Sequence, residues 1–184
     1  MRRCRRIIIR FGKLMNFRFR LTSAIIVSAF LVATQTYAVD DPRAALRFPD
    51  DQIALTLHAK GSQIYDCKAG GDGSPEWTFK APEADLFLGE EKVGHHFAGP
   101  SWEYRDGSRI TGKAVGKADS ARPAQDIPWL RVSVQSHAGT GELDGVSIVL
   151  RINTEGGVLQ GACKDVGAQA NAPYEADYVF VRRP

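Results

Sequence analysis

The sequence has 184 residues, and its 24 Lys and Arg against 21 Asp and Glu give a formal net charge of +3 at pH 7. Eight of the basic residues and none of the acids precede Val39, so residues 39–184 carry 16 bases against 21 acids, a net charge of −5. Nucleic-acid-binding proteins need a positive surface, and we therefore exclude nucleic acid as a partner.

Residues 1–38 have the organisation of a secretory signal peptide. Residues 1–20 are basic, residues 21–33 are apolar, and small residues follow at Thr36 and Ala38. A basic segment, an apolar run of about a dozen residues and a small-x-small site in this order are typical of such a signal. We predict cleavage after Ala38.

Other interpretations of this segment stay open. Translation from Met15 would give a shorter signal of more ordinary length. An uncleaved anchor is the alternative, although the apolar run is shorter than the roughly 20 residues that a helix needs to cross a bilayer. No Cys directly follows the run, as a lipoprotein would require, and the Arg pairs near Met1 lie far from it, which favours general export over the twin-arginine route. The prediction is an exported protein, periplasmic or extracellular, with no membrane insertion after cleavage.

Residues 39–184 are expected to form a single β domain with one disulfide. Removing 38 of the 184 residues leaves 146, a length that fits one domain with a sizeable core. Cys67 and Cys163 are the two cysteines of this part. An even pair in an exported protein predicts a disulfide, with two buried free thiols as the alternative.

In chain order, this domain shows short segments of alternating apolar and polar residues without helical periodicity. Turn-forming runs rich in Gly, Pro, Asp and Asn lie between them, and residues 116–128 form a longer polar loop. The pattern predicts an all-β fold, an antiparallel β-sandwich or flattened barrel of about nine strands. The expected strands are residues 53–58, 63–67, 76–79, 84–88, 92–97, 108–115, 129–135, 146–153 and 174–182.

Alternation assigns faces in two of these strands, because successive side chains of a strand point to opposite sides. In residues 129–135 the core-facing side chains are expected to be Leu130, Val132 and Val134. In residues 146–153 they are expected to be Val146, Ile148, Leu150 and Ile152. Arg151 and Asn153 then leave the strand on its non-core face, where they either bind a ligand or are solvated.

Residues 93–112 hold the densest run of chemically active side chains. His95 and His96 are adjacent, so they point to opposite faces of a strand. A zinc site needs three or four converging ligands, and no spacing brings His58 or His137 to either of them. We predict no metal site.

Two catalytic interpretations of the same run are considered. Ser101 is not part of a G-x-S-x-G elbow, so a serine hydrolase is not expected. Glu103 and Asp106 could form the carboxylate pair of glycoside chemistry, but Asp106 also lies in "RDGS", a turn sequence. We favour the turn.

Trp102 and Tyr104 share one face of a strand in this run. If they were exposed, they would suit a groove for a sugar or another small ligand. If they are buried, they are core residues, and we favour the core.

Seven stretches resemble, in order, the blocks of domain of unknown function family 3455, small exported bacterial proteins with fungal relatives. They are "GSQIYDC", "WTFKAPEADL", "VGHHFAGPSWEYRDGS", "IPWLRVSV", "RINTEGG", "GACKD" and "YEADYVF". The resemblance spans about residues 46–182 and implies an exported single domain with no established activity or cofactor. Ser62 precedes Gln63 where a Gly–Val is expected, which affects only the start of that strand. A malate dehydrogenase label on some fungal relatives does not fit, because no G-x-G-x-x-G joins a strand to a helix.

The favoured hypothesis is a non-catalytic binding or envelope-associated module without a cofactor, whose ligand is a small molecule or saccharide. Its site lies where strands meet turns, the usual place for function on a rigid scaffold. The alternatives are a secreted saccharide hydrolase or lyase that uses Glu103 and Asp106 as acid and base, and a purely structural envelope protein. The candidate binding residues are His95, His96, Trp102, Glu103, Asp106 and Arg151.

Overall fold

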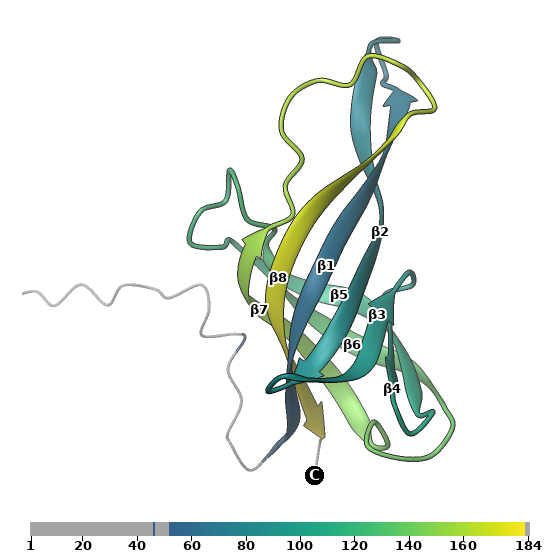
Figure 1. Ribbon diagram of the computed structural model, residues 1–184, viewed down its shortest axis with the longest axis vertical. Helices are drawn as coiled ribbons and strands as arrows, with labels where there is room; N and C mark the ends of the chain where they lie inside the picture. Colours follow the sequence, from purple (N-terminus) through teal and green to yellow (C-terminus); the bar gives the residue numbers. More distant parts are fainter. Residues whose placement is uncertain (1–45, 47–51, 183–184) are drawn as a thin grey trace, which may run out of the picture. The chain divides into compact units, whose positions relative to one another are not determined.

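The computed structural model describes Leu46 and residues 52–182, so the expected signal segment at residues 1–38 lies outside the described residues. Eight antiparallel strands form a ring-like sheet, a flattened barrel, in which each strand pairs with the next and β8 pairs with β1 (Figure 1). The predicted all-β class is therefore confirmed. The strands are β1 (Ile53–Ala69), β2 (Pro75–Leu88), β3 (Glu91–Phe97), β4 (Ser101–Tyr104), β5 (Arg109–Ala118), β6 (Trp129–Ala138), β7 (Val146–Gly156) and β8 (Gln169–Arg182).

The structure has eight strands rather than nine because β1 and β2 each join two expected strands, while β4 is an additional one. Gly61 lies within β1, where a Cβ would come 2.1 Å from the Glu83 carbonyl oxygen of β2. Glycine therefore marks a close approach of two backbones here and not the end of a strand. Pro82 lies in the part of β2 that pairs with β1 alone, and proline is tolerated at such an edge.

Aromatic side chains fill the interior of the barrel. Trp102 stacks on His96 with ring centroids 4.7 Å apart and meets Tyr178 and Phe180 edge-on at 5.7 and 6.3 Å. Tyr104 belongs to the same buried cluster. Edge-to-face and offset pairs of this kind stabilise beyond the area they bury. The preference for Trp102 and Tyr104 as core residues is confirmed.

The face assignment of β6 is confirmed, but that of β7 is wrong. Val132 lies in the barrel core with Leu130 and Val134 packed against it. In β7 the pairing with β8 shifts between Val146 and Ile148, so the alternation changes phase after Val146. As a result Val149 points into the barrel, and Ile148 and Leu150 join a second apolar cluster instead.

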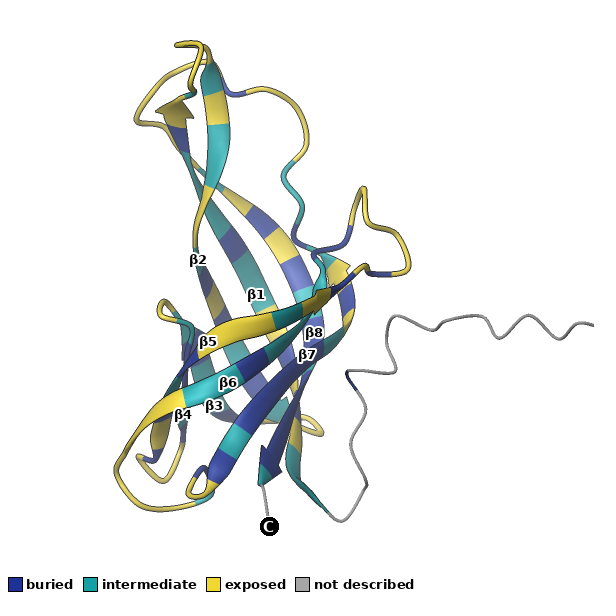
Figure 2. Ribbon diagram, turned by 180° about the vertical axis from the view of Figure 1, so that it is seen from behind, coloured by how far each residue is buried: buried dark blue, intermediate teal, exposed yellow. Residues whose placement is uncertain are grey.

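This second cluster lies on the other side of β7 and β8, so residues 148–151 of β7 and 178–181 of β8 are buried on both faces; most of β7 is dark blue in Figure 2. Arg151 follows Val149 on the inner face and is only 9% exposed, contrary to its expected non-core position. Asn153 does reach the outer surface, where its side-chain nitrogen donates to the Asp177 carboxylate at 2.9 Å.

No helix in the described part of the chain is long and apolar enough to span a membrane.

The predicted disulfide is confirmed. Cys67 near the end of β1 is bonded to Cys163 in the loop between β7 and β8, with their Cα atoms 5.9 Å apart. The backbone of Cys67 also accepts from the Gly167 N–H at 2.9 Å and donates to the Ala168 carbonyl at 2.8 Å. The bond fastens this loop to the end of the β1–β2 hairpin. A disulfide is typical of an oxidising, extracytoplasmic compartment.

We expect the Cys67→Ala, Cys163→Ala double variant to be less stable than the wild type. The bond joins residues 96 positions apart, and closing a loop of this length stabilises by about 4–5 kcal/mol in the chain-entropy model. Denaturant unfolding of both proteins checks this, with wild type under reducing conditions as the control. Equal free energies of unfolding would show that the loop needs no covalent attachment.

Candidate functional site

The structure separates the six candidate residues into three places. His96, Trp102 and Arg151 are buried inside the barrel. His95 and Glu103 lie on the outer face, where both line one shallow hollow of about 280 Å³. Asp106 lies in the turn between β4 and β5 and does not line that hollow.

The charged groups of the outer hollow are already paired with neighbours. His95 Nε2 lies 2.8 Å from a Glu83 carboxylate oxygen, and Arg109 donates to Glu103 through Nε at 2.9 Å and through Nη2. Lys92 and Asp85 form another pair at 2.6 Å. Exposed pairs of this kind contribute about 0–1 kcal/mol each, and they leave little unpaired charge for a ligand.

Asp106 organises its turn, as the turn interpretation predicts. One carboxylate oxygen accepts from the Ser108 N–H at 2.8 Å and from the Ser108 hydroxyl at 2.6 Å, and the other accepts from the Glu142 N–H at 2.7 Å. The Ser108 hydroxyl, followed by the Glu142 N–H, holds the pKa of Asp106 below its usual value. A general acid needs a raised pKa, so these contacts do not support an acid–base pair with Glu103.

The four histidines lie in separate surroundings. His58 meets Glu175 and Asp177 on the outer face, and His137 Nε2 lies 2.8 Å from the Val146 carbonyl oxygen. No group of three or more His, Cys, Asp and Glu among the described residues could hold a metal ion.

His96 is held as a neutral ring in the barrel core. Its Nδ1 lies 2.8 Å from the Ser101 carbonyl oxygen, which can only accept, so Nδ1 carries the proton. Burial lowers the pKa of His96 to about 3, and the hydrogen bond to Ser101 offsets only part of that effect. Its stacking on Trp102 makes it a packing residue of the core.

A site that the sequence did not predict lies next to the two short strands, β3 and β4. β3 pairs with β2 only from Ala84 onward, and β4 pairs with β5 only over residues 109–111. Beyond these residues, β2 and β5 each lack a paired strand on the side that faces β3 and β4, among the described residues. The shortness of β3 and β4 is visible in Figure 1. A hollow of about 310 Å³ opens there, with Tyr65, Phe79, Lys117, Pro128, Leu130 and Arg151 in its lining.

Arg151 forms the polar part of this hollow. Its Nε and Nη2 donate to the Pro128 carbonyl oxygen at 3.1 and 2.9 Å, and no carboxylate among the described residues forms an ion pair with it. It lies close enough to Tyr178 to act on that hydroxyl: burial raises the pKa of Tyr178, and the positive charge of Arg151 partly offsets the rise. A buried guanidinium without a counter-ion is an unusual arrangement.

Gln63 supplies a second buried polar group to the hollow. It is 2% exposed and lies beside Tyr174, whose pKa it lowers slightly against the larger rise caused by burial. Its Nε2 nevertheless makes no hydrogen bond of normal geometry. Buried polar groups in native proteins are nearly always hydrogen-bonded, so this donor has capacity for a further partner.

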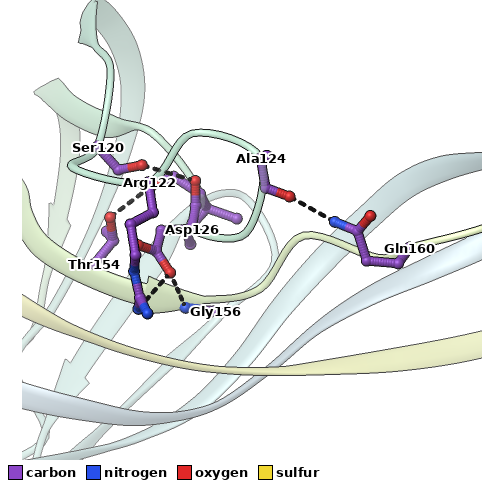
Figure 3. A network of polar contacts seen from close by, with 8 residues as sticks. Ser120, Arg122, Ala124, Asp126, Thr154, Gly156 and Gln160 are labelled. Carbon is purple, nitrogen blue, oxygen red and sulfur yellow. Dashed lines mark hydrogen bonds and ion pairs between the residues drawn. The ribbon is translucent and has the colours of Figure 1, made fainter.

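The loop between β5 and β6 is fastened to the last residues of β7 (Figure 3). Asp126, 2% exposed, pairs with Arg122 at 2.9 Å and accepts from the Gly156 N–H at 2.7 Å. The Thr154 hydroxyl donates to the Ile127 carbonyl oxygen. These contacts hold Ile127 in the core cluster and Pro128 beside Arg151, so the loop borders the hollow on this side.

A family model described as "Protein of unknown function (DUF3455)" matches residues 49–89 and 88–182. The chain belongs to this family. The DUF3455 match covers both cysteines of the disulfide and every residue named above in the lining of the hollow. No curated protein and no solved structure matches the chain.

We expect the stability of this DUF3455 protein to fall as the pH is lowered from about 6.5 towards 3, in part because of His96. The folded state keeps the ring neutral down to a pKa of about 3, whereas the unfolded state binds a proton near pH 6.5. Over this range the unfolded state carries one more proton, so His96 alone lowers the free energy of unfolding by about 1.4 kcal/mol per pH unit.

Denaturant unfolding of wild type and His96→Asn between these pH values tests this expectation. The variant should show a pH slope smaller by about one proton, and the same substitution at half-exposed His58 is the matched control. NMR titration of the His96 ring is a second measurement that needs no variant. A ring that protonates near pH 6 in the folded protein would contradict the assignment.

Proposed function

We propose that the protein is a non-catalytic binding protein of the extracytoplasmic space, which takes a small molecule in the hollow between β2 and β5. The site keeps Arg151 from the candidate residues and adds Gln63, Tyr65, Phe79, Lys117 and Leu130. Support for the compartment comes from the Cys67–Cys163 disulfide and from the signal segment expected at residues 1–38, which together favour the periplasm or the exterior.

The observation that carries the proposal is a hollow in which apolar walls meet buried polar donors. Ligand sites are concave and mostly apolar, with a few polar groups that orient the ligand, and in barrels they occur at the mouth. The hollow has these features: Leu130 packs against the core cluster, and Arg151 and Gln63 are buried polar residues in its lining. Its volume of about 310 Å³ is at the lower end of the usual range of about 300–1,000 Å³, which suits a small ligand.

Phe79 marks the rim of this site. It is a large apolar side chain that is 50% exposed, and its ring meets Tyr65 edge-on with centroids 5.9 Å apart. A ligand that covers these two rings would remove apolar surface from water, which stabilises by roughly 25 cal/mol per Å². Leu88, on the same strand, is 46% exposed but does not line the hollow.

Of the other candidate residues, His96 and Trp102 do not line the hollow. They pack against Tyr178 in the core. His95, Glu103 and Asp106 are engaged in contacts with neighbouring residues, and we give them no part in binding.

We expect a thermal-shift screen with small aromatic and aliphatic acids, amines and neutral compounds to yield ligands that stabilise the mature protein. A ligand at 100 times its Kd stabilises by about 2.7 kcal/mol. The shift should be strongly reduced in Phe79→Ala, because the rim loses its ring, and retained in Leu88→Ala.

Two results would contradict the proposal. If no compound raises the melting temperature, a structural role in the envelope is the better conclusion. If a bound saccharide is consumed, and Glu103→Gln with Asp106→Asn abolishes this turnover, the protein is an enzyme that acts at the outer face.

A further inference from the structure

The charges that line the hollow between β2 and β5 are all positive. Arg151 and Lys117 are its ionisable cations, and no Asp or Glu lines it. Three other hollows on the surface each include an acid in their lining. Glu103 lines the one near His95, Glu155 and Glu175 line one beside Gly61, and Asp126 lines one beside Trp129. In a domain with 16 bases against 21 acids, a lining without acids favours an anionic ligand.

Neither cation is neutralised by a carboxylate of the described residues. Arg151 donates to a neutral carbonyl oxygen through Nε and Nη2, and the Lys117 ammonium makes no ion pair with a described residue. A guanidinium keeps its positive charge in proteins, so its burial carries a desolvation cost that a bound anion would help to offset. Gln63 Nε2 is a third donor without a partner.

The rest of the hollow is apolar. Tyr65, Phe79 and Leu130 provide two aromatic rings and an aliphatic side chain, and the Tyr65 hydroxyl is already engaged, donating to the Gly157 carbonyl oxygen at 2.7 Å. These three side chains provide no unengaged hydrogen-bond donor for the hydroxyl groups of a sugar. They fit a flat ring or a short alkyl chain.

We propose that the ligand is a small amphipathic carboxylic acid, bound as its carboxylate. The carboxylate lies at Arg151 and Lys117, with Gln63 as a further donor, and the aromatic or alkyl body packs against Tyr65, Phe79 and Leu130. A carboxylate is favoured over a phosphate monoester because the site is largely apolar, and the second negative charge of a phosphate raises the cost of leaving water. This inference rests on the proposed function.

Matched pairs of probes test the ligand class. Phenylpropionate and hexanoate have the proposed head group and bodies, and phenylpropionamide and hexanamide have the same bodies without the charge. Titration calorimetry at neutral pH and low salt should show the acids binding about tenfold or more tightly than the amides, because charge-assisted hydrogen bonds are the stronger ones. Added salt should weaken the acids more than the amides.

Two variants and one control locate the charge. Lys117→Gln should weaken the acids and leave the amides unchanged, whereas Lys113→Gln, a change to another exposed lysine of β5 outside the hollow, should affect neither. Arg151→Gln should abolish the preference for acids. Because Arg151 also holds Pro128, circular dichroism must first show that this variant folds, and Lys117→Gln keeps the test decisive if it does not.

The outcomes separate the ligand class from the proposed function. If amides bind as tightly as acids and Phe79→Ala weakens both, the carboxylate assignment is wrong and the binding site stands. Phenyl phosphate binding more tightly than phenylpropionate would likewise overturn the assignment alone. If neither acids nor amides bind, the ligand class is wrong, and if nothing in the wider screen binds either, the proposed function fails with it.

Discussion

The pairing of β8 with β1 is the contact on which the rest of the structure depends. It runs from Ile53 to Asp66 of β1 and turns a chain of neighbouring strands into a ring. In an eight-stranded ring the interior is just wide enough for side chains to fill it, so the inward residues of all strands compete for one small space. Trp102, Tyr178 and Phe180 are the largest fully buried side chains, and the buried polar residues Gln63 and Arg151 line the hollow beside this core.

The ring is closed, but its strands differ in length. β4 has four residues, whereas β1 has 17, so the β3–β4 hairpin covers only part of the length of its neighbours. Where it ends, the inward side of β6 and β7 is accessible between β2 and β5. The hollow lies where these two adjacent strands end, and the inward-facing Arg151 is part of its lining.

Much of the fold could be predicted from the sequence, because its signals are local. Alternation in β6, the glycine-rich turns and the even pair of cysteines each depend on a few neighbouring residues. The inward position of Arg151 could not be predicted in this way: the apolar residues of β7 occur on both faces, and the shift in pairing after Val146 depends on β8. The candidate site was also beyond local reasoning, since Gln63, Phe79 and Lys117 come from three strands that alternation alone cannot bring together.

The ion pairs on the outer face also affect which strands pair with one another. Opposite charges meet across several pairs of neighbouring strands: Glu175 of β8 meets Lys60 of β1, Asp66 of β1 meets Lys80 of β2, Asp85 of β2 meets Lys92 of β3, and Glu103 of β4 meets Arg109 of β5. Each pair is worth little once formed. Opposite charges on neighbouring strands favour the pairing that brings them together, whereas like charges directly opposite one another are unfavourable. The charges on the outer surface therefore favour the strand pairings that are observed, a role that a stability measurement on the finished barrel would hardly detect.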